Sequence, residues 1–317
     1  MKEESKKITI GGQAVIEGVM MRNGGKYAVA VRKPDKEIEV SGNNFTPAAE
    51  KNVIAKLPIV RGVVSFIESL VIGTKTLTYS ASFFDEEEED QKKEKKSGTD
   101  WALYGTVALS VVLAVGLFML LPAWIAGMLE KVIDNHVLIG LIEGVIRLAI
   151  FLGYVAVISL MEDIKRTFMY HGAEHKTINC LEHGEALTVE NVMKHTRFHK
   201  RCGTSFLFIV MFVSILVFMC ITTRTMWLRL VLRILLVPLI AGISYEFIRY
   251  AGAHENVCAN TLSKPGLWVQ RLTTREPDPD MVEVAIASVE AVLDWRAYLK
   301  EQGVVLDETE GTSPEGE

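Results

Sequence analysis

Two histidines and a glutamate lie close together near the middle of the 317-residue chain, in the stretch His171-Gly-Ala-Glu174-His175. On a helix, residues four apart lie on one face, one turn apart, so both imidazoles can bind the same ion. Glu174 lies near that face. This H-x-x-E-H spacing is typical of the inverted zinc-peptidase motif, in which the metal activates water and the carboxylate transfers protons. The pattern predicts a divalent-metal site, with zinc as the expected ion, His171 and His175 as ligands, and Glu174 as the catalytic acid/base.

A catalytic zinc ion of this kind needs a third protein ligand. Glu246 is the first candidate, because the predicted topology returns the last membrane span to the side on which His171 lies. The remaining candidates follow in the order His254, Glu255, His199 and Cys202. The last two lie in His195-x-x-x-His199-Lys-Arg-Cys202, a second pair of histidines four apart with a thiol three residues further on.

The same histidines allow other interpretations. His171/His175 and His195/His199 both read H-x-x-x-H, and membrane desaturases and hydroxylases place such boxes on the cytosolic side of a four-span bundle to hold two irons. The sequence lacks an H-x-x-H-H box, which favours hydrolysis over this di-iron oxidase alternative. Histidines with basic and aromatic neighbours also suit the headgroup boundary of a bilayer, where they would be structural.

Membrane spans are expected from the composition. Hydrophobic residues make up 49% of the chain and charged residues 23%, and the mean hydropathy is +0.24. Four apolar segments are long enough to cross a bilayer: 102–129, 137–161, 205–223 and 226–250. Charged residues inside these segments are costly unless they pair or line a path. They therefore support a non-enzymatic alternative, a membrane scaffold or transport component.

Basic residues predict the orientation of these spans. The His-rich loop 162–204, between the second and third spans, is rich in Lys and Arg. The connections on the other side offer only Lys131 and Arg224. Because cytoplasmic loops carry the excess of Lys and Arg, we expect a multi-pass protein of the cell membrane. Both termini and the His-rich loop then lie in the cytoplasm.

The remaining segments predict a small cytoplasmic α+β part. Residues 8–47 read as a three-strand β meander, with turns at Asn23-Gly24 and at Pro34-Asp35-Lys36. Residues 48–82 predict amphipathic helices that either lie at the membrane surface or pack on the meander. The fold class is therefore an α-helical membrane protein with four transmembrane helices and a small cytoplasmic α+β part that includes the N-terminal meander.

The domain boundaries follow from these segments. The membrane domain covers 101–250. The other parts are a charged linker (83–100), a cytoplasmic C-terminal region (251–304) and a disordered acidic tail (305–317). The net charge of −5 is too small to indicate a partner, and no nucleic acid is expected. The expected partners are the lipid bilayer and either a soluble cytoplasmic protein or a second copy of the chain.

Several long motifs resemble the YqhQ-like family of bacterial membrane proteins. They are GGQAVIEGVMMR from Gly11, PIVRG from Pro58, HGAEHK from His171, RCGTSF from Arg201 and LWVQRLTTREPD from Leu267. The resemblance extends from Gly11 to about Val292. It implies a multi-span membrane protein of a family described both as a domain of unknown function and as predicted metal-dependent enzymes. It implies no particular reaction or substrate.

Overall fold

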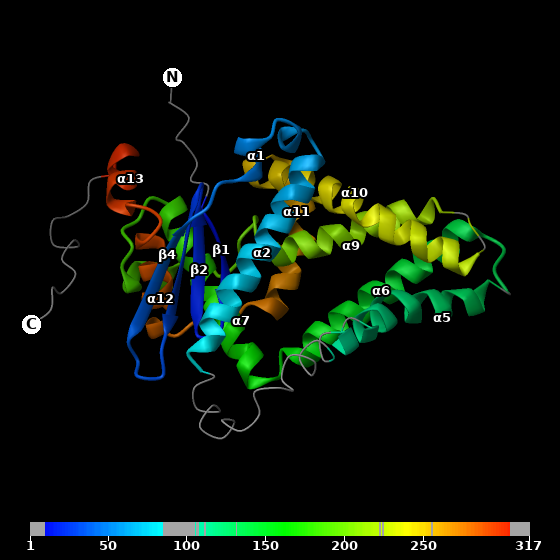
Figure 1. Cartoon of the computed structure of the whole chain (residues 1–317), viewed down its shortest axis with the longest axis horizontal. Coiled ribbons are helices and arrows are strands. Elements are labelled where there is room, and N and C mark those ends of the chain that lie inside the picture. The colour runs from blue at the N-terminus through cyan, green and yellow to red at the C-terminus, as the bar shows by residue number, and fades with distance from the viewer. Residues whose placement is uncertain are drawn as a thin grey trace, which may run out of the picture.

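The structure is a computed structural model of the chain. It describes residues 10–84, 105, 108–110, 112–130, 132–221, 223, 225–254 and 256–304. Almost all of the predicted charged linker and the whole predicted acidic tail lie outside these residues. The described part is mostly helical and has one antiparallel four-stranded sheet near its N-terminus (Figure 1).

The N-terminal sheet is a meander with the strand order β1-β2-β3-β4. Its strands are β1 (Gly11–Val15), β2 (Gly18–Asn23), β3 (Lys26–Arg32) and β4 (Ile38–Asn44). The Asn-Gly pair forms the predicted turn, with Asn23 paired to Lys26 across it. An antiparallel sheet at this end of the chain is therefore confirmed.

The predicted number of strands is wrong by one. The run from Ala14 to Met21 reads as one strand, but the structure reverses it at Ile16-Glu17, so that Val15 pairs with Gly18. Glu17 takes a left-handed conformation with φ of 48°, which is uncommon for a residue with a side chain. Its carboxylate accepts a hydrogen bond from Arg166 Nε at 2.5 Å and another from the Tyr170 hydroxyl at 3.2 Å. These distant contacts stabilise a turn that local propensity does not predict.

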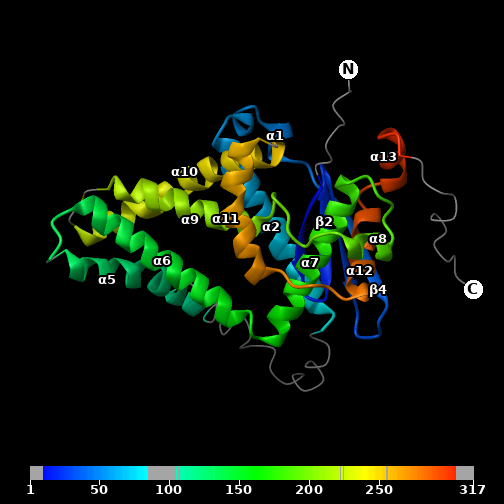
Figure 2. The ribbon, with the colours of Figure 1, turned by 180° about the vertical axis from the view of Figure 1, so that it is seen from behind.

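Both faces of the sheet are covered by helices, because alternate residues of a strand point to opposite faces. Val19, Met21, Ala28 and Ala30 pack with α7 (Glu162–Glu182) and α12 (Pro279–Glu290). The alternate residues of the strands, whose side chains point to the other face, pack with α2 (Val60–Ser82). They are Val15, Met20, Val29 and Val31. Figures 1 and 2 show α2 on one side of the sheet and α7 with α12 on the other. Two short helices complete this part, α8 (Val189–Lys194) and α13 (Trp295–Glu301).

Helix α2 joins the sheet to the apolar helices. It follows α1 (Ala48–Lys51) and the 3-10 turn η1 (Ile54–Lys56). In its first turns, Gly62 lies against Gly242 and Tyr245 of α10 (Met226–Ala253), and further on Gly73 lies against the Gln13 side chain of β1. Packing on the meander, one of the two predicted alternatives, therefore holds for the second half of the helix.

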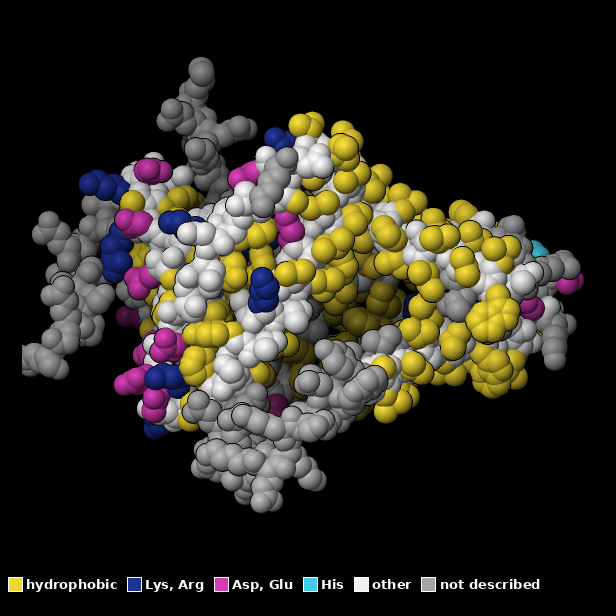
Figure 3. Space-filling model, viewed as in Figure 1, with side chains coloured by type: hydrophobic (Ala, Val, Ile, Leu, Met, Phe, Trp, Pro, Cys, Tyr) yellow, Lys and Arg dark blue, Asp and Glu magenta, His cyan; other side chains and the backbone are white. Residues whose placement is uncertain are grey.

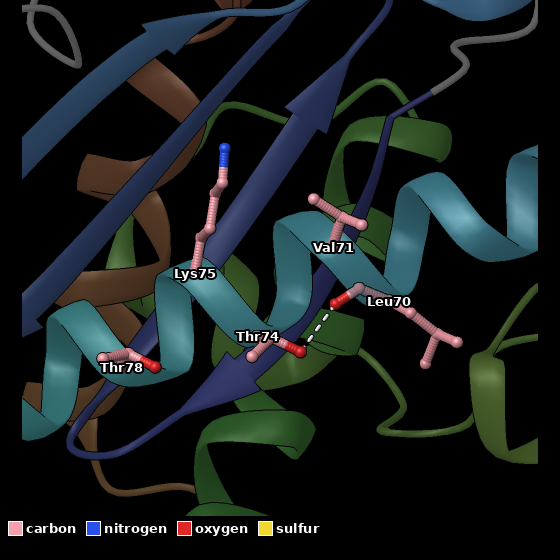
Figure 4. Close-up of a pocket in the computed structure, with 5 residues that line it drawn as sticks. All are labelled: Leu70, Val71, Thr74, Lys75 and Thr78. Carbon is pink, nitrogen blue, oxygen red and sulfur yellow. Dashed lines mark hydrogen bonds between the residues drawn. The ribbon is translucent and has the colours of Figure 1, made fainter. Parts of the chain in front are cut away.

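The outer side of α2 stays exposed. Leu70 and Val71 are about half exposed, at 53% and 50%. They line a shallow groove together with Thr74, Lys75 and Thr78 (Figure 4). Lys75 is the only titratable residue in this lining, and none of the candidate site residues is part of it. The groove is therefore separate from the histidine cluster.

Three described helices are long and apolar enough to cross a membrane: Ala108–Leu129, His136–Ile158 and Trp227–Ala253. Four were predicted. The segment 205–223 forms α9 (Gly203–Met219), which is apolar but has only 17 residues. Figure 3 shows hydrophobic side chains covering the half of the molecule that holds these helices, whereas acidic and basic side chains gather over the sheet.

The apolar helices form two pairs. The π-helical turn η2 (Gly116–Leu120) and α5 (Leu121–Leu129) run beside α6 (His136–Ile158), and α9 runs beside α10. Figure 1 shows that the two pairs diverge towards the sheet. Glu143 of α6 joins them, because its carboxylate binds Arg147 at 2.8 Å and Arg233 of α10 at 2.6 Å. Glu143, a charge within the second predicted span, is therefore paired across the bundle with Arg233.

Candidate metal centre

Helix α7 presents the three residues of the H-x-x-E-H motif. The helix runs from Glu162 to Glu182 and has two acidic residues in its first turn, where the positive end of the helix dipole favours negative charge. The rings of His171 and His175 lie one turn apart, with their centroids 4.4 Å from each other. His175 is 1% exposed and Glu174 5% exposed. The motif therefore faces the protein interior.

A thiol from a different helix completes the cluster. Cys202 is the N-cap of α9 and is buried. Its Sγ lies 3.2 Å from His171 Nε2 and 3.2 Å from Thr204 Oγ1, and the Thr204 backbone N–H donates to it at 3.4 Å. The ligand atoms of His171, His175 and Cys202 all lie within 4.8 Å of one another. Two imidazoles and a thiol at this spacing can surround a single ion.

Both histidine rings are oriented by backbone carbonyls. His171 Nδ1 lies 2.8 Å from the Thr273 carbonyl oxygen, and His175 Nδ1 lies 2.7 Å from that of Arg197. Because a carbonyl can only accept, each Nδ1 carries the hydrogen, and Nε2 is the atom available to a ligand. His175 Nε2 is buried and has no hydrogen-bond partner among the described residues. An unsatisfied buried nitrogen of this kind is costly unless something binds it.

The cluster shifts the pKa of two of its members. Burial alone would lower the pKa of His171, but the neighbouring Cys202 thiolate outweighs it and raises that pKa to about 9. Burial alone would raise the pKa of Cys202. The charges of His171 and His175 outweigh it, and the pKa of the thiol lies well below its usual value. The shift therefore favours the thiolate, which is the form that binds metals.

Glu174 lies between the histidines and the sheet. Burial raises its pKa, against the opposing influence of His175 and His171. On the sheet side its neighbour is Gly12 of β1, where an added Cβ would lie 2.9 Å from the Glu174 Cγ and Cδ atoms. A buried carboxyl with a raised pKa beside two imidazoles is suited to accept and release a proton.

The other predicted ligands lie elsewhere. Glu246 binds Arg61 of α2, with 2.5 Å between Arg61 Nε and its Oε1, so the proposal of Glu246 as third ligand is not supported. Helix α10 packs against α2, which brings Glu246 to Arg61 and not to the histidines of α7. His254 is exposed and stacks on Tyr250, with its Nδ1 3.0 Å from the carbonyl oxygen of that residue. Glu255 lies outside the described residues.

His199 lies at the border of the cluster. Its ring centroid is 5.7 Å from that of His175, but its Nε2 faces Glu182 at 3.4 Å. Its partner in the second H-x-x-x-H pair, His195, belongs to another group with Cys180 and Glu185. In that group Cys180 donates to the carbonyls of Glu185 and Ala186, and burial, followed by the charge of Glu185, raises its pKa to about 12. The two pairs therefore belong to different environments.

Several residues that shape the centre were not predicted from the sequence. Gln270 of α11 (Val257–Thr273) is fully buried; its Oε1 accepts from the His199 backbone N–H, and its Nε2 donates to the His199 carbonyl and to Ser205 Oγ. These bonds fix the segment that leads into Cys202. Gln270 and Thr273 lie in the motif LWVQRLTTREPD, so the motif itself was the available signal.

Comparison with known proteins defines the family of the chain. The chain is 36% identical over 300 residues to the uncharacterized protein YqhQ of Bacillus subtilis (strain 168), covering 92% of this chain and 94% of that protein. Residues 57–295 match the model of the protein family of unknown function DUF1385, a range that contains every member of the cluster. No solved structure matches the chain. The chain therefore belongs to the DUF1385 family.

Proposed function

We propose that the protein binds one divalent cation, zinc, through His171, His175 and Cys202. The observation that carries this proposal is the buried Nε2 of His175, which has no described hydrogen-bond partner and faces a thiol and a second imidazole. Nitrogen and thiolate ligands are the set that zinc prefers. The carbonyls of Thr273 and Arg197 hold the two rings in the tautomer that such binding needs.

The centre is proposed to act in hydrolysis. Three protein ligands leave one position free, and a zinc ion bound in this way supplies Lewis-acid activation of water. Glu174 is the proton carrier: its raised pKa lets it accept a proton from water and give it to the leaving group. Burial of Glu174 and His175 keeps bulk water from competing. Cys202 replaces Glu246 in the ligand set expected from the sequence.

The location at a membrane is part of the same proposal. Three helices are long and apolar enough to span a bilayer, and α9 adds an apolar segment that begins directly at Cys202. The distribution of Lys and Arg supports a cytoplasmic position for the cluster and for both termini. A reporter fused after Val189 should read cytoplasmic, and an external reading would overturn this arrangement.

Elemental analysis of the detergent-purified protein tests the ion. About one zinc per chain is expected in the wild type, and the variant Cys202→Ser should lose most of it. Two irons per chain would instead support the di-iron alternative. No bound metal after incubation with zinc, manganese or iron would overturn the metal centre and favour a scaffold or transport role.

The variant Glu174→Gln tests the chemistry separately from binding. It keeps the size of the side chain but cannot accept a proton. Zinc content should stay at the wild-type value, while hydrolysis of ester and amide probes falls by about 10²–10⁴-fold. Unchanged turnover would remove Glu174 from the mechanism. Turnover by the metal-free protein that iodoacetamide abolishes would make Cys202 a nucleophile rather than a ligand.

A further inference from the structure

Strand β1 has a free edge. Among the described residues it is the first strand of the order β1-β2-β3-β4, and its one partner strand there is β2. In an antiparallel pair, the N–H and C=O groups of successive residues point alternately towards the partner and away from it. Edge strands therefore offer a row of unpaired donors and acceptors to another chain.

The backbone hydrogen bonds identify which residues face this edge. The Arg32 N–H donates to the Glu17 carbonyl at 2.9 Å, so the odd-numbered positions of β2 face β3 and the even-numbered ones face β1. Gly18, Met20 and Arg22 therefore bond to Val15, Gln13 and Gly11. It follows that Gly12 and Ala14 direct their N–H and C=O groups outward. Among the described residues, no further backbone partner is found for either.

The free edge passes the candidate metal centre. Gly12 pairs with Met21 and so faces the α7 side of the sheet, where its Cα approaches the Glu174 side chain. Gly11 and Gly12 are exposed, and an added Cβ at Gly11 would meet nothing within 4 Å. At the far end, the Ser80 hydroxyl of α2 accepts the Ile16 N–H at 3.2 Å and closes the edge. The open stretch is therefore the one beside Glu174.

We propose that the substrate of the metal centre is an extended polypeptide segment that pairs with the free edge of β1 at Gly12 and Ala14. This inference rests on the proposed hydrolytic function. An added strand lies about 4.8 Å from its neighbour and repeats its amide groups in step with it. It would carry one peptide group past Glu174. A lipid has no such row of amide groups, so the edge distinguishes a peptide from a lipid substrate.

The reaction needs water alone as co-reactant. The water oxygen bonds to the carbonyl carbon, and the C–N bond breaks. One water proton passes through Glu174 to the departing nitrogen, which leaves as an amine, and the other fragment keeps a new carboxyl group. Neither oxidant nor reductant enters, and the atoms of peptide and water are all found in the two products.

Amide exchange tests the binding step without requiring turnover. Zinc-loaded protein carrying Glu174→Gln is mixed with short synthetic peptides of random sequence. Exchange at Gly12 and Ala14 should slow about tenfold, the effect of roughly 1.4 kcal/mol of added hydrogen bonding. Peptides methylated at every backbone nitrogen, which have no edge able to pair with β1, should give no protection. Protection by phospholipid vesicles instead of peptides would overturn the inference.

A pair of proline variants tests the edge in turnover. Ala14→Pro removes an outward N–H of β1. Gly42→Pro is the matched control and removes an outward N–H of β4, the opposite edge strand. The even-numbered residues of β4 face outward because the Lys33 N–H donates to the Glu37 carbonyl. Ala14→Pro should lower kcat/KM for the peptides at least about tenfold. Zinc content should not change. Gly42→Pro should stay within about twofold of wild type, because Gly42 lies far from Glu174 in the strand order.

The outcomes separate this inference from the hydrolytic function. Peptide cleavage without protection of Gly12 and Ala14 would overturn substrate pairing with β1 but leave the proposed hydrolytic function standing. Protection without any cleavage would support the edge and overturn hydrolysis. If the zinc-bound protein shows neither protection of Gly12 and Ala14 nor cleavage of the peptides, the inference is overturned. If Ala14→Pro fails to fold, the exchange experiment on the otherwise native sheet still decides.

Discussion

Helix α7 contributes residues to two clusters of similar residue types that differ in what the thiol does. In the first, Cys202 accepts from Thr204 and lies beside two histidines, and its pKa is lowered. In the second, Cys180 donates to backbone carbonyls, and its pKa is raised to about 12. The hydrogen-bonding direction around sulfur therefore distinguishes the thiol that we propose as a ligand from a structural one. Residue type and spacing alone do not.

Zinc content should distinguish the clusters most strongly. The double variant His171→Ala/His175→Ala should lose nearly all bound zinc, because two of three ligands disappear. The double variant Cys180→Ser/His195→Ala is the matched control and should keep about one zinc per chain. Elemental analysis of both proteins measures the difference. Zinc lost from the second variant alone would exchange the roles of the two clusters.

Alkylation of the metal-free protein should separate the two thiols by their pKa. Cys202 has a lowered pKa, so its thiolate persists to lower pH than that of an ordinary cysteine and is lost as the pH falls through the lowered pKa. Cys180 has a pKa of about 12 and gains thiolate only as the pH rises towards it. At pH 7, iodoacetamide should label Cys202 on the order of a hundredfold faster, as read by peptide mass spectrometry. Zinc should suppress labelling of Cys202 alone. Equal rates across pH 7–9 would contradict the assigned environments.

A glycine substitution should show how closely the first cluster depends on its neighbours. A Cβ at Gly172 would collide with the carbonyl oxygen of Arg275, in the segment that supplies the Thr273 carbonyl to His171. Gly172→Ala should destabilise the protein by about 1–3 kcal/mol and weaken zinc binding. Thermal unfolding with and without zinc measures both effects. Gly153→Ala on α6 has open space around it and should change neither.

The smallest expected effects come from two threonines that lie beside the clusters, Thr204 and Thr188. Thr204→Val removes the hydroxyl beside Cys202 Sγ and should weaken zinc affinity by about tenfold. Thr188→Val removes the N-cap of α8 next to the second cluster, which should lower stability by about 1 kcal/mol. Competition with a chromogenic chelator measures the affinities. A zinc affinity that depended on Thr188 rather than Thr204 would contradict the comparison.

The sequence predicted the parts of the centre that lie within one helical turn. His171, Glu174 and His175 are carried by one helix, as their spacing required. Cys202 was a candidate, but Glu246 ranked above it because the predicted topology returns the last span to the side of the membrane on which His171 lies. Residues on the same side of a membrane need not be in contact: Glu246 of α10 binds Arg61 of α2 instead. The metal itself stays a prediction.

Other features could not be predicted because they depend on distant backbone atoms. The carbonyls that orient the histidines come from Arg197 and Thr273, and a carbonyl is the same in every residue type. The reversal at Glu17 depends on Arg166, 149 positions further along the chain. Hydropathy predicted four spans, but the 17 residues of α9 fall short of the length that the other three reach.

The origin of the His171 orientation has a consequence for biosynthesis. The carbonyl that fixes this ring belongs to Thr273, and Gly12 from the opposite end of the chain borders Glu174. A nascent chain that has just exposed α7 and α9 holds both histidines and the thiol but lacks this carbonyl. The ribosome must therefore complete α11 before the ligands acquire their final geometry. A polypeptide that terminates before Thr273 would carry the three candidate ligands without the carbonyl that orients His171, so the proposed metal binding would follow the synthesis of α11.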